Sequence, residues 1–285
     1  MVNNKIFTIL IIGFLSFIMA VFAPSIQSVQ RVNELYIFGD SLSDVGNIYR
    51  ATGGLYPSSP PYFQGRYSNG QVWVEYLSSG LGLTPKQSIN FAFGGATSGS
   101  TNMNGIPGLL AQVEKFTSSH PDVNPNGLYV LWAGANDYIY GSANATLAVD
   151  NLGRAIQSLS LVGAKKIIVA NLPDLGKLPA TRNTSNSSAL SQSAIAHNLG
   201  LAKSVDVLRD KLGDDTQIIE LDVNSLYREA ITEPAKFGFT NTSSACLNKV
   251  TTCDNPDKFL FWDGIHPTTI GHKLLAEAAL KALKN

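Results

Sequence analysis

Short runs of apolar residues alternate along the chain with longer segments in which apolar residues recur every three or four positions. The short runs are rich in branched and aromatic side chains and predict buried β-strands. The longer segments predict amphipathic helices. The predicted strands are 35–38, 89–93, 128–132, 166–170 and 218–221. The predicted helices are 71–81, 106–116, 146–161, 188–212 and 269–283.

The alternation of strands and helices predicts a parallel sheet joined by right-handed crossovers. The strands are continuous apolar runs without regular polar alternation, which indicates a sheet covered by helices on both faces. We therefore expect one three-layer α/β domain over residues 29–285. The helix over 146–161 is expected to face the core through Leu147, Leu152, Ile156 and Leu159.

Residues 1–28 have the pattern of a secretory signal peptide. Lys5 precedes an apolar run from Ile6 to Ala23, and small residues follow it. The alternative is an uncleaved membrane anchor, because the run reaches the lower length limit of a membrane-spanning helix. We favour cleavage, and hence a secreted or periplasmic protein with no stable transmembrane span.

The content of charged residues and cysteines argues against some classes of binding partner and metal site. Charged residues make up 15% of the chain, and 21 Lys and Arg balance 21 Asp and Glu. Because phosphate backbones are bound by clustered basic residues, we expect no nucleic-acid partner. The two cysteines, Cys246 and Cys253, are too few for a cysteine-rich zinc site, and in an exported protein they favour a local disulfide. We expect a monomer.

Four groups of chemically distinctive residues stand at the ends of predicted strands or just before the last helix. Functional groups of open parallel sheets gather beyond the carboxyl ends of the strands. The candidates are Ser41, Gly95, Asn136, Asp263 and His266. They stand in the segments Gly39-Asp40-Ser41-Leu42, Gly94-Gly95, Gly134-Ala135-Asn136-Asp137 and Asp263-Gly264-Ile265-His266-Pro267.

Each group alone also fits a helix cap or a turn. Together they supply a hydroxyl nucleophile, an imidazole base, a carboxylate that orients the base, and donors for an oxyanion, which is the equipment of acyl transfer. Only His266 has an aspartate three residues ahead of it. The other histidines, His120, His197 and His272, are interpreted as structural or solvated.

On these motifs the chain resembles the GDSL lipase/esterase family, also called SGNH hydrolases. Residues 39–47 are similar to the first block of the family, 90–97 to the second, 134–137 to the third and 263–267 to the last. The segments 171–176 and 261–266 are most similar to the phospholipase/lecithinase/haemolysin branch. Ser41 does not stand in a Gly-x-Ser-x-Gly elbow, which argues against the α/β-hydrolase fold.

The resemblance implies a flavodoxin-like α/β/α fold with a five-stranded parallel sheet in the order 2-1-3-4-5. It implies no metal and no organic cofactor. Asp40, Asp44 and Asn47 are interpreted as supports of the turn that carries Ser41.

The resemblance also implies a role for each candidate. Ser41 is the expected nucleophile, His266 the base and Asp263 the residue that orients it. The backbone N–H groups of Ser41 and Gly95 and the side-chain amide of Asn136 are the expected oxyanion hole.

The favoured function is a secreted serine esterase or lipase that acts on small-molecule or lipid esters through an acyl-enzyme. The first alternative is a carbohydrate O-acetyl esterase or acetyl transferase with the same site, because a surface low in charge suits sugars. The second is a catalytically inactive binding module, which the complete residue set disfavours. Five aromatic residues are candidates for a sugar platform, for an acyl groove or for plain packing: Tyr56, Tyr62, Phe63, Tyr67 and Trp73.

Overall fold

Five parallel strands form the central sheet in the order β2-β1-β3-β4-β5, which confirms the predicted topology. The strands are β1 (Glu34–Gly39), β2 (Ser88–Asn90), β3 (Gly127–Trp132), β4 (Lys166–Ala170) and β5 (Gln217–Leu221). This computed structural model describes residues 31–100, 105–141, 144–249 and 251–284. The predicted signal peptide at 1–28 lies outside the described residues.

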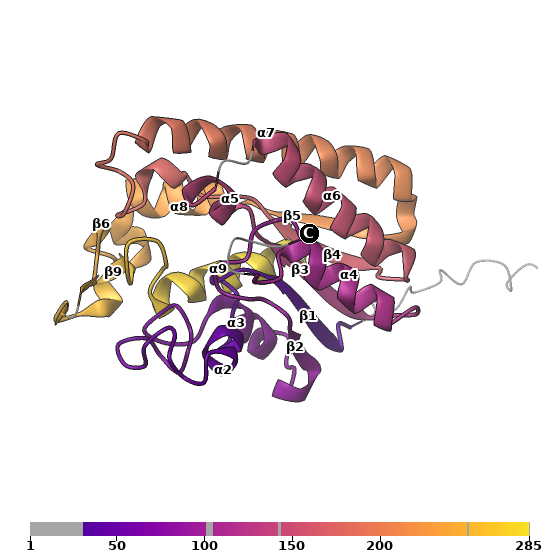
Figure 1. Cartoon of the computed structure of the whole chain (residues 1–285), viewed down its shortest axis with the longest axis horizontal. Coiled ribbons are helices and arrows are strands. Elements are labelled where there is room, and N and C mark those ends of the chain that lie inside the picture. The colour runs from indigo at the N-terminus through magenta and orange to yellow at the C-terminus, as the bar shows by residue number, and fades with distance from the viewer. Residues whose placement is uncertain (1–30, 101–104, 142–143, 250, 285) are drawn as a thin grey trace, which may run out of the picture. The chain divides into compact units, whose positions relative to one another are not determined.

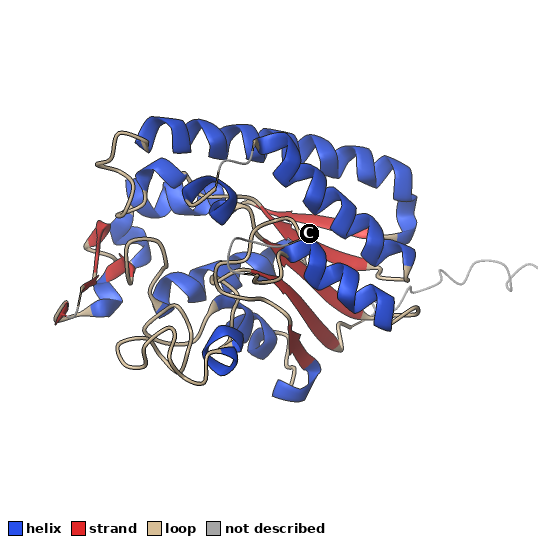
Figure 2. Cartoon of the chain, in the orientation of Figure 1, coloured by secondary structure: helices blue, strands red, loops and turns tan. Residues whose placement is uncertain are grey.

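Helices cover the sheet on both faces, so the architecture is the predicted three-layer α/β/α arrangement (Figures 1 and 2). They are α2 (Asn47–Ala51), α3 (Trp73–Gly80), α4 (Leu109–Ser119), α5 (Ala135–Ile139), α6 (Ala145–Leu161), α7 (Ser187–Leu212), α8 (Val223–Thr232) and α9 (Thr269–Ala282). Within these described ranges, no helix combines the length and the hydrophobicity that crossing a bilayer requires.

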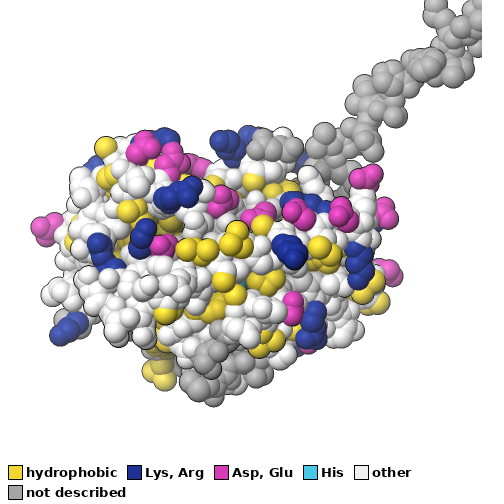
Figure 3. All heavy atoms as spheres, turned by 90° about the horizontal axis from the view of Figure 1, so that it is seen from above, with side chains coloured by type: hydrophobic (Ala, Val, Ile, Leu, Met, Phe, Trp, Pro, Cys, Tyr) yellow, Lys and Arg dark blue, Asp and Glu magenta, His cyan; other side chains and the backbone are white. Residues whose placement is uncertain are grey.

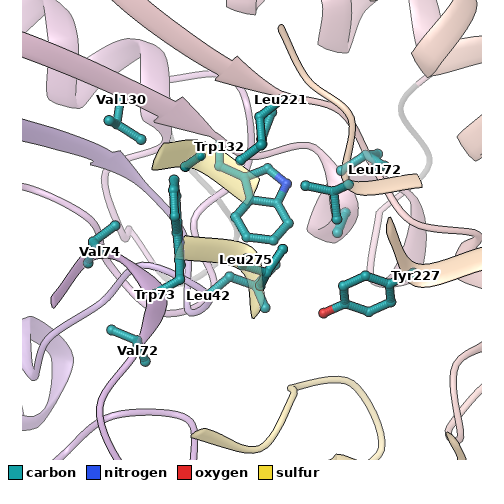
Figure 4. Close-up of a cluster of buried hydrophobic side chains, with 14 of the residues drawn as sticks. Leu42, Val72, Trp73, Val74, Val130, Trp132, Leu172, Leu221, Tyr227 and Leu275 are labelled. Carbon is teal, nitrogen blue, oxygen red and sulfur yellow. The ribbon is translucent and has the colours of Figure 1, made fainter. Parts of the chain in front are cut away.

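The strands send alternate side chains into two separate cores, which is why their buried residues are apolar on both faces of the sheet. Leu35 and Ile37 of β1 belong to the core shared with α3, α8 and α9. At its centre the Trp73 and Trp132 rings meet edge to face with their centroids 5.6 Å apart. Figure 4 shows these two rings surrounded by aliphatic side chains. Trp73 is therefore a core residue, with no exposed surface to line a platform or groove.

Phe38 of β1 points into the second core, under α4, α6 and α7. On α6, Leu152, Ile156 and Leu159 are buried there as predicted. The prediction was wrong for Leu147, whose side chain is 55% exposed although Ala148 and Val149 in the same turn are buried, because a residue five positions before Leu152 lies about 140° around the helix from it. Figure 3 views this helical layer from above, with hydrophobic side chains scattered among charged ones.

A small second arrangement of strands precedes the last helix and was not predicted. β6 (Asn241–Ala245) pairs with β9 (Phe259–Phe261), and β7 (Leu247–Asn248) pairs with β8 (Thr251–Thr252). A disulfide joins Cys246 to Cys253 across the β7–β8 hairpin. The Cys246 and Leu247 N–H groups bond the carbonyl groups of Phe261 and Trp262, so the hairpin is attached to the segment that leads to Asp263.

His272 of α9 is fully buried, and neither of its ring nitrogens has a hydrogen-bond partner among the described residues. Burial, together with the nearby charge of His266, lowers the pKa of His272 to about 3. The folded protein therefore keeps this imidazole neutral in mildly acidic solution, whereas the unfolded chain binds a proton below about pH 6.5. The contribution of His272 to stability consequently falls as the pH decreases through that range.

We expect His272→Leu to make the protein less sensitive to acid. The wild type should lose about 1.4 kcal/mol of unfolding free energy per pH unit below about pH 6.5 through this residue alone. Between about pH 7.5 and about pH 5.0 the wild type should thus lose about 2 kcal/mol more than the variant, as measured by urea unfolding. His120→Gln, at an exposed histidine, is the control and should retain the wild-type acid response. Equal acid responses of wild type and His272→Leu would contradict the prediction.

Candidate active site

Ser41 lies in the turn that directly follows β1, at the carboxyl end of the central strands. The turn begins at Gly39, where a side chain has no room: a Cβ atom would lie 2.4 Å from the carbonyl oxygen of Trp132 in β3. Asp40 Oδ1 then accepts the Leu42 N–H at 3.0 Å and closes the turn. Burial raises the pKa of Asp40 to about 7, despite that hydrogen bond and the nearby His266.

The structure brings Ser41, His266 and Asp263 together, although Ser41 and His266 are 225 residues apart in sequence. The Ser41 hydroxyl and His266 Nε2 are 2.8 Å apart. The other ring nitrogen of His266, Nδ1, lies 2.7 Å from Asp263 Oδ2 and 2.9 Å from Oδ1. Hydroxyl, imidazole and carboxylate therefore form one continuous hydrogen-bonded line.

The charges of this line support one another. Burial by itself raises the pKa of Asp263, but the charge of His266 and the hydrogen bonds that the carboxylate accepts lower it to about 2. Burial by itself lowers the pKa of His266, but the charge and hydrogen bond of Asp263 raise it above its ordinary value. Asp263 therefore stays ionised at neutral pH and favours protonation of the imidazole beside Ser41.

Asp44 joins the Ser41 loop to the glycine turn after β2. Its buried carboxylate accepts the backbone N–H groups of Gly46, Asn47, Ile48 and, across the gap between the loops, Gly94. Burial raises the pKa of Asp44, and these hydrogen bonds oppose the rise. These hydrogen bonds hold the loop of Ser41 and the glycine turn after β2 at fixed positions relative to each other.

Asn47 and Asn90 reinforce the same junction with their side chains. Asn47 Nδ2 donates to the carbonyl oxygens of Ala92 at 2.7 Å and of Asn90 at 3.1 Å. Asn90 Nδ2 donates in return to the carbonyl oxygen of Ser43 at 2.7 Å. The segment that follows Ser41 is thus anchored to the loop after β2.

Gly95 lies in the glycine turn after β2 and Asn136 at the start of α5, and these two segments are joined to each other. Gly95 adopts a φ of 81°, which favours glycine. Asn136 stands in the first turn of α5, directly after β3, and its Nδ2 donates to the carbonyl oxygen of Ala96 at 2.9 Å. An amide nitrogen carries two hydrogens, and within the described residues this bond accounts for one of them.

His197 of α7 packs beneath the Asn136 loop. It is fully buried, and its Nδ1 lies 2.9 Å from the Tyr138 hydroxyl. Its ring fills the space next to Gly134, where a Cβ atom would lie 2.8 Å from Cε1. Burial lowers the pKa of His197 to about 4. A neutral imidazole under a loop has the structural role expected of this histidine.

Two tyrosines contact the His266–Asp263 pair, and sequence reasoning assigned neither of them to it. The Tyr62 hydroxyl donates to Asp263 Oδ2 at 2.7 Å. The Tyr67 ring lies against the imidazole of His266, with centroids 5.0 Å apart. Tyr62 and Asp263 are separated by 201 residues, and nothing in the local sequence around Tyr62 indicates the contact.

Comparisons with known proteins agree with the motifs. The sequence model of the GDSL-like lipase/acylhydrolase family matches residues 35–279. A phosphatidylcholine-sterol acyltransferase from Aeromonas hydrophila is 30% identical over 87% of this chain and 89% of its own length. A thermolabile hemolysin from Vibrio parahaemolyticus is 28% identical over 90% of this chain, which spans only 65% of that longer protein.

A solved structure supports the same fold at much lower identity. An aryl esterase from M. smegmatis superposes with a TM-score of 0.55 over 88% of this chain and 98% of its own, at 13% identity. At that identity the likeness concerns the fold alone. Fold, sequence family and the residues at the strand ends thus agree with one another.

Proposed function

The chain belongs to the GDSL-like lipase/acylhydrolase family and is an ester hydrolase, and from this premise we propose that it is a secreted serine esterase or lipase that works through an acyl-enzyme. The observation that carries the proposal is the unbroken line from the Ser41 hydroxyl through His266 to Asp263. Its substrates are carboxylic esters of lipids or small molecules.

In the first half of the reaction Ser41 attacks the ester carbonyl. His266 Nε2 takes the hydroxyl proton as the oxygen–carbon bond forms. Asp263 holds the Nδ1 proton and stabilises the imidazolium that results. His266 then gives its proton to the leaving alcohol, and the acyl group stays on Ser41.

In the second half water replaces the alcohol and the same groups act again. His266 takes a proton from the water as the water attacks the acyl carbonyl, and returns it to the Ser41 oxygen when the acid leaves. In both halves negative charge develops on the carbonyl oxygen. We assign its stabilisation to the Ser41 and Gly95 N–H groups and the second Asn136 amide hydrogen.

Secretion is supported by two features of the sequence and structure. Lys5 and the apolar run from Ile6 to Ala23 fit a cleaved signal peptide. The Cys246–Cys253 disulfide fits an oxidising compartment. The protein is expected to accumulate outside the cytosol, with its amino terminus a few residues beyond Ala23, as N-terminal sequencing of exported protein would reveal.

The substrate class is tested with p-nitrophenyl esters from acetate to palmitate and with acetylated glycans. We expect hydrolysis to extend to medium and long acyl chains, since relatives named as an acyltransferase of phosphatidylcholine and as a hemolysin share the family. A fluorophosphonate probe should label the peptide that contains Ser41. Hydrolysis of acetyl esters alone would assign the carbohydrate O-acetyl esterase instead. A folded protein that neither hydrolyses esters nor reacts with the probe would be the binding module.

A further inference from the structure

We propose that Tyr62 is a positioning residue for this reaction: its hydroxyl fixes the Asp263 carboxylate and thereby tunes the basicity of His266. The inference rests on the proposed roles of Ser41, His266 and Asp263. It adds a fourth member, from a loop far away in sequence, to the hydrogen-bonded line.

The two oxygens of Asp263 both lie within hydrogen-bond distance of His266 Nδ1, but their other partners differ. Oδ1 accepts the backbone N–H groups of Ile265 at 2.8 Å and His266 at 2.7 Å, which ties it to its own loop. Oδ2 faces His266 Nδ1 at 2.7 Å and also accepts the Tyr62 hydroxyl at 2.7 Å. Tyr62 is the only side chain other than His266 that hydrogen-bonds this carboxylate in the part of the chain that the structure describes.

Tyr62 is itself held in place on several sides. Its ring packs against the cluster formed by Trp262 and the disulfide-linked β7–β8 hairpin. Its backbone N–H bonds the Ser58 carbonyl oxygen at 3.1 Å, and its ring meets Tyr67 edge to face at 6.2 Å. The hydroxyl is therefore aimed at Asp263 before any substrate arrives, and little conformational freedom is lost when the hydrogen bond forms.

The phenol acts as a fixed donor that does not ionise in the working range. Burial, followed by the charge of Asp263, raises the pKa of Tyr62 far above neutrality. A neutral donor draws negative charge toward itself and weakens the pull of the carboxylate on the imidazolium. Removing it should therefore make Asp263 more basic and raise the pKa of His266, while Oδ2 loses its external support.

Other titratable groups also face the pair and must be kept constant in the test. These groups come from four different segments: Asp40 follows β1, Tyr67 lies in the same loop as Tyr62, Tyr140 follows α5, and His272 is on α9. A change confined to the Tyr62 hydroxyl leaves all four in place.

The test compares the pH dependence of ester hydrolysis in wild type and Tyr62→Phe, which keeps the ring and its packing. We expect kcat to fall by about 3- to 10-fold with KM for a short ester unchanged, because the lost hydrogen bond acts on the reacting groups only through Asp263. The acidic limb of kcat/KM should move upward by about half a pH unit, because His266 must lose its proton to act. A Tyr62→3-fluorotyrosine protein, a stronger donor of the same shape, should move that limb downward.

Tyr36→Phe is the matched control. The Tyr36 hydroxyl donates to Glu34 Oε2 at the same 2.7 Å, but at the opposite end of β1 from Ser41. This variant loses a phenol–carboxylate hydrogen bond and should keep the wild-type pH profile. A general loss of stability would affect both variants, whereas a shifted acidic limb is expected only at Tyr62.

Labelling by fluorophosphonate distinguishes failure of the proposed function from failure of the role given to Tyr62. A wild type that is not labelled at Ser41 removes the proposed function, and the role of Tyr62 with it. If the wild type is labelled at Ser41 but Tyr62→Phe and the fluorotyrosine protein both keep the wild-type pH profile, the role of Tyr62 is overturned and the proposed function stands. Limbs that shift in opposite directions for the two substitutions support it.

Discussion

Ser41→Ala is expected to abolish ester hydrolysis and leave the fold intact. The hydroxyl is the atom that His266 Nε2 faces at 2.8 Å, and no other hydroxyl is recorded on that nitrogen among the described residues. Loss of a serine nucleophile lowers kcat by roughly 10⁴- to 10⁶-fold, and the small activity that remains comes from the oxyanion donors. The measurement is the initial rate on p-nitrophenyl esters, together with a thermal unfolding curve.

Ser79→Ala provides the comparison, because Ser79 is an exposed serine of α3 that lies outside the hydrogen-bonded line. It should retain full activity and full labelling by fluorophosphonate. A cleanly purified, folded Ser41→Ala protein with more than about a tenth of the wild-type rate would remove Ser41 as nucleophile.

Asp263→Asn is expected to have the second largest effect, a fall in kcat of about 10³- to 10⁴-fold. The Ile265 and His266 N–H groups hold the Oδ1 position, so the amide oxygen of the variant should stay there. Its NH₂ group then faces His266 Nδ1 and donates to it. The imidazole proton is forced onto Nε2, where it points at Ser41 and prevents the ring from accepting the hydroxyl proton.

This substitution also has a signature in the pH profile. Without the carboxylate charge, the pKa of His266 loses the main influence that raises it, so the acidic limb of residual activity should move to lower pH. Asp206→Asn, at an exposed ion pair with Arg209 on α7, is the control and should leave rate and profile unchanged. A wild-type rate in Asp263→Asn would show that the carboxylate charge is dispensable.

The sheet and the proximity of Ser41, Asp263 and His266 could be predicted because the relevant signals are local. Each strand is a continuous apolar run, and each candidate stands within a few residues of a strand end or helix start. One strand was predicted too long: β2 ends at Asn90, although the Phe91 and Phe93 N–H groups still bond carbonyl groups of β1. Parallel topology then brings the strand ends together without further information.

What sequence reasoning missed depends on contacts between distant segments or on weak patterns. The hydrogen bond from Tyr62 to Asp263 forms only when the loop that contains Pro57, Pro60 and Pro61 packs against the segment before α9. α8 escaped prediction because its ten residues bury only Val223, Tyr227 and Ala230. Leu147 was assigned to the core as an apolar residue of α6, but it stands five residues before Leu152 and so faces away from the stripe formed by Leu152, Ile156 and Leu159.

The sequence separation of 225 between Ser41 and His266 has a consequence for when, during folding, the protein can begin to hydrolyse esters. A chain growing on the ribosome completes β1 and Ser41 early, yet lacks His266, the proposed base, until the segment before α9 has been made. Contacts of such separation form late, because a long stretch of chain must first be ordered. An incomplete chain therefore contains Ser41 but is expected to be inactive. In a refolding experiment, the time at which ester hydrolysis appears reports when α9 packs against α3, not when the sheet forms.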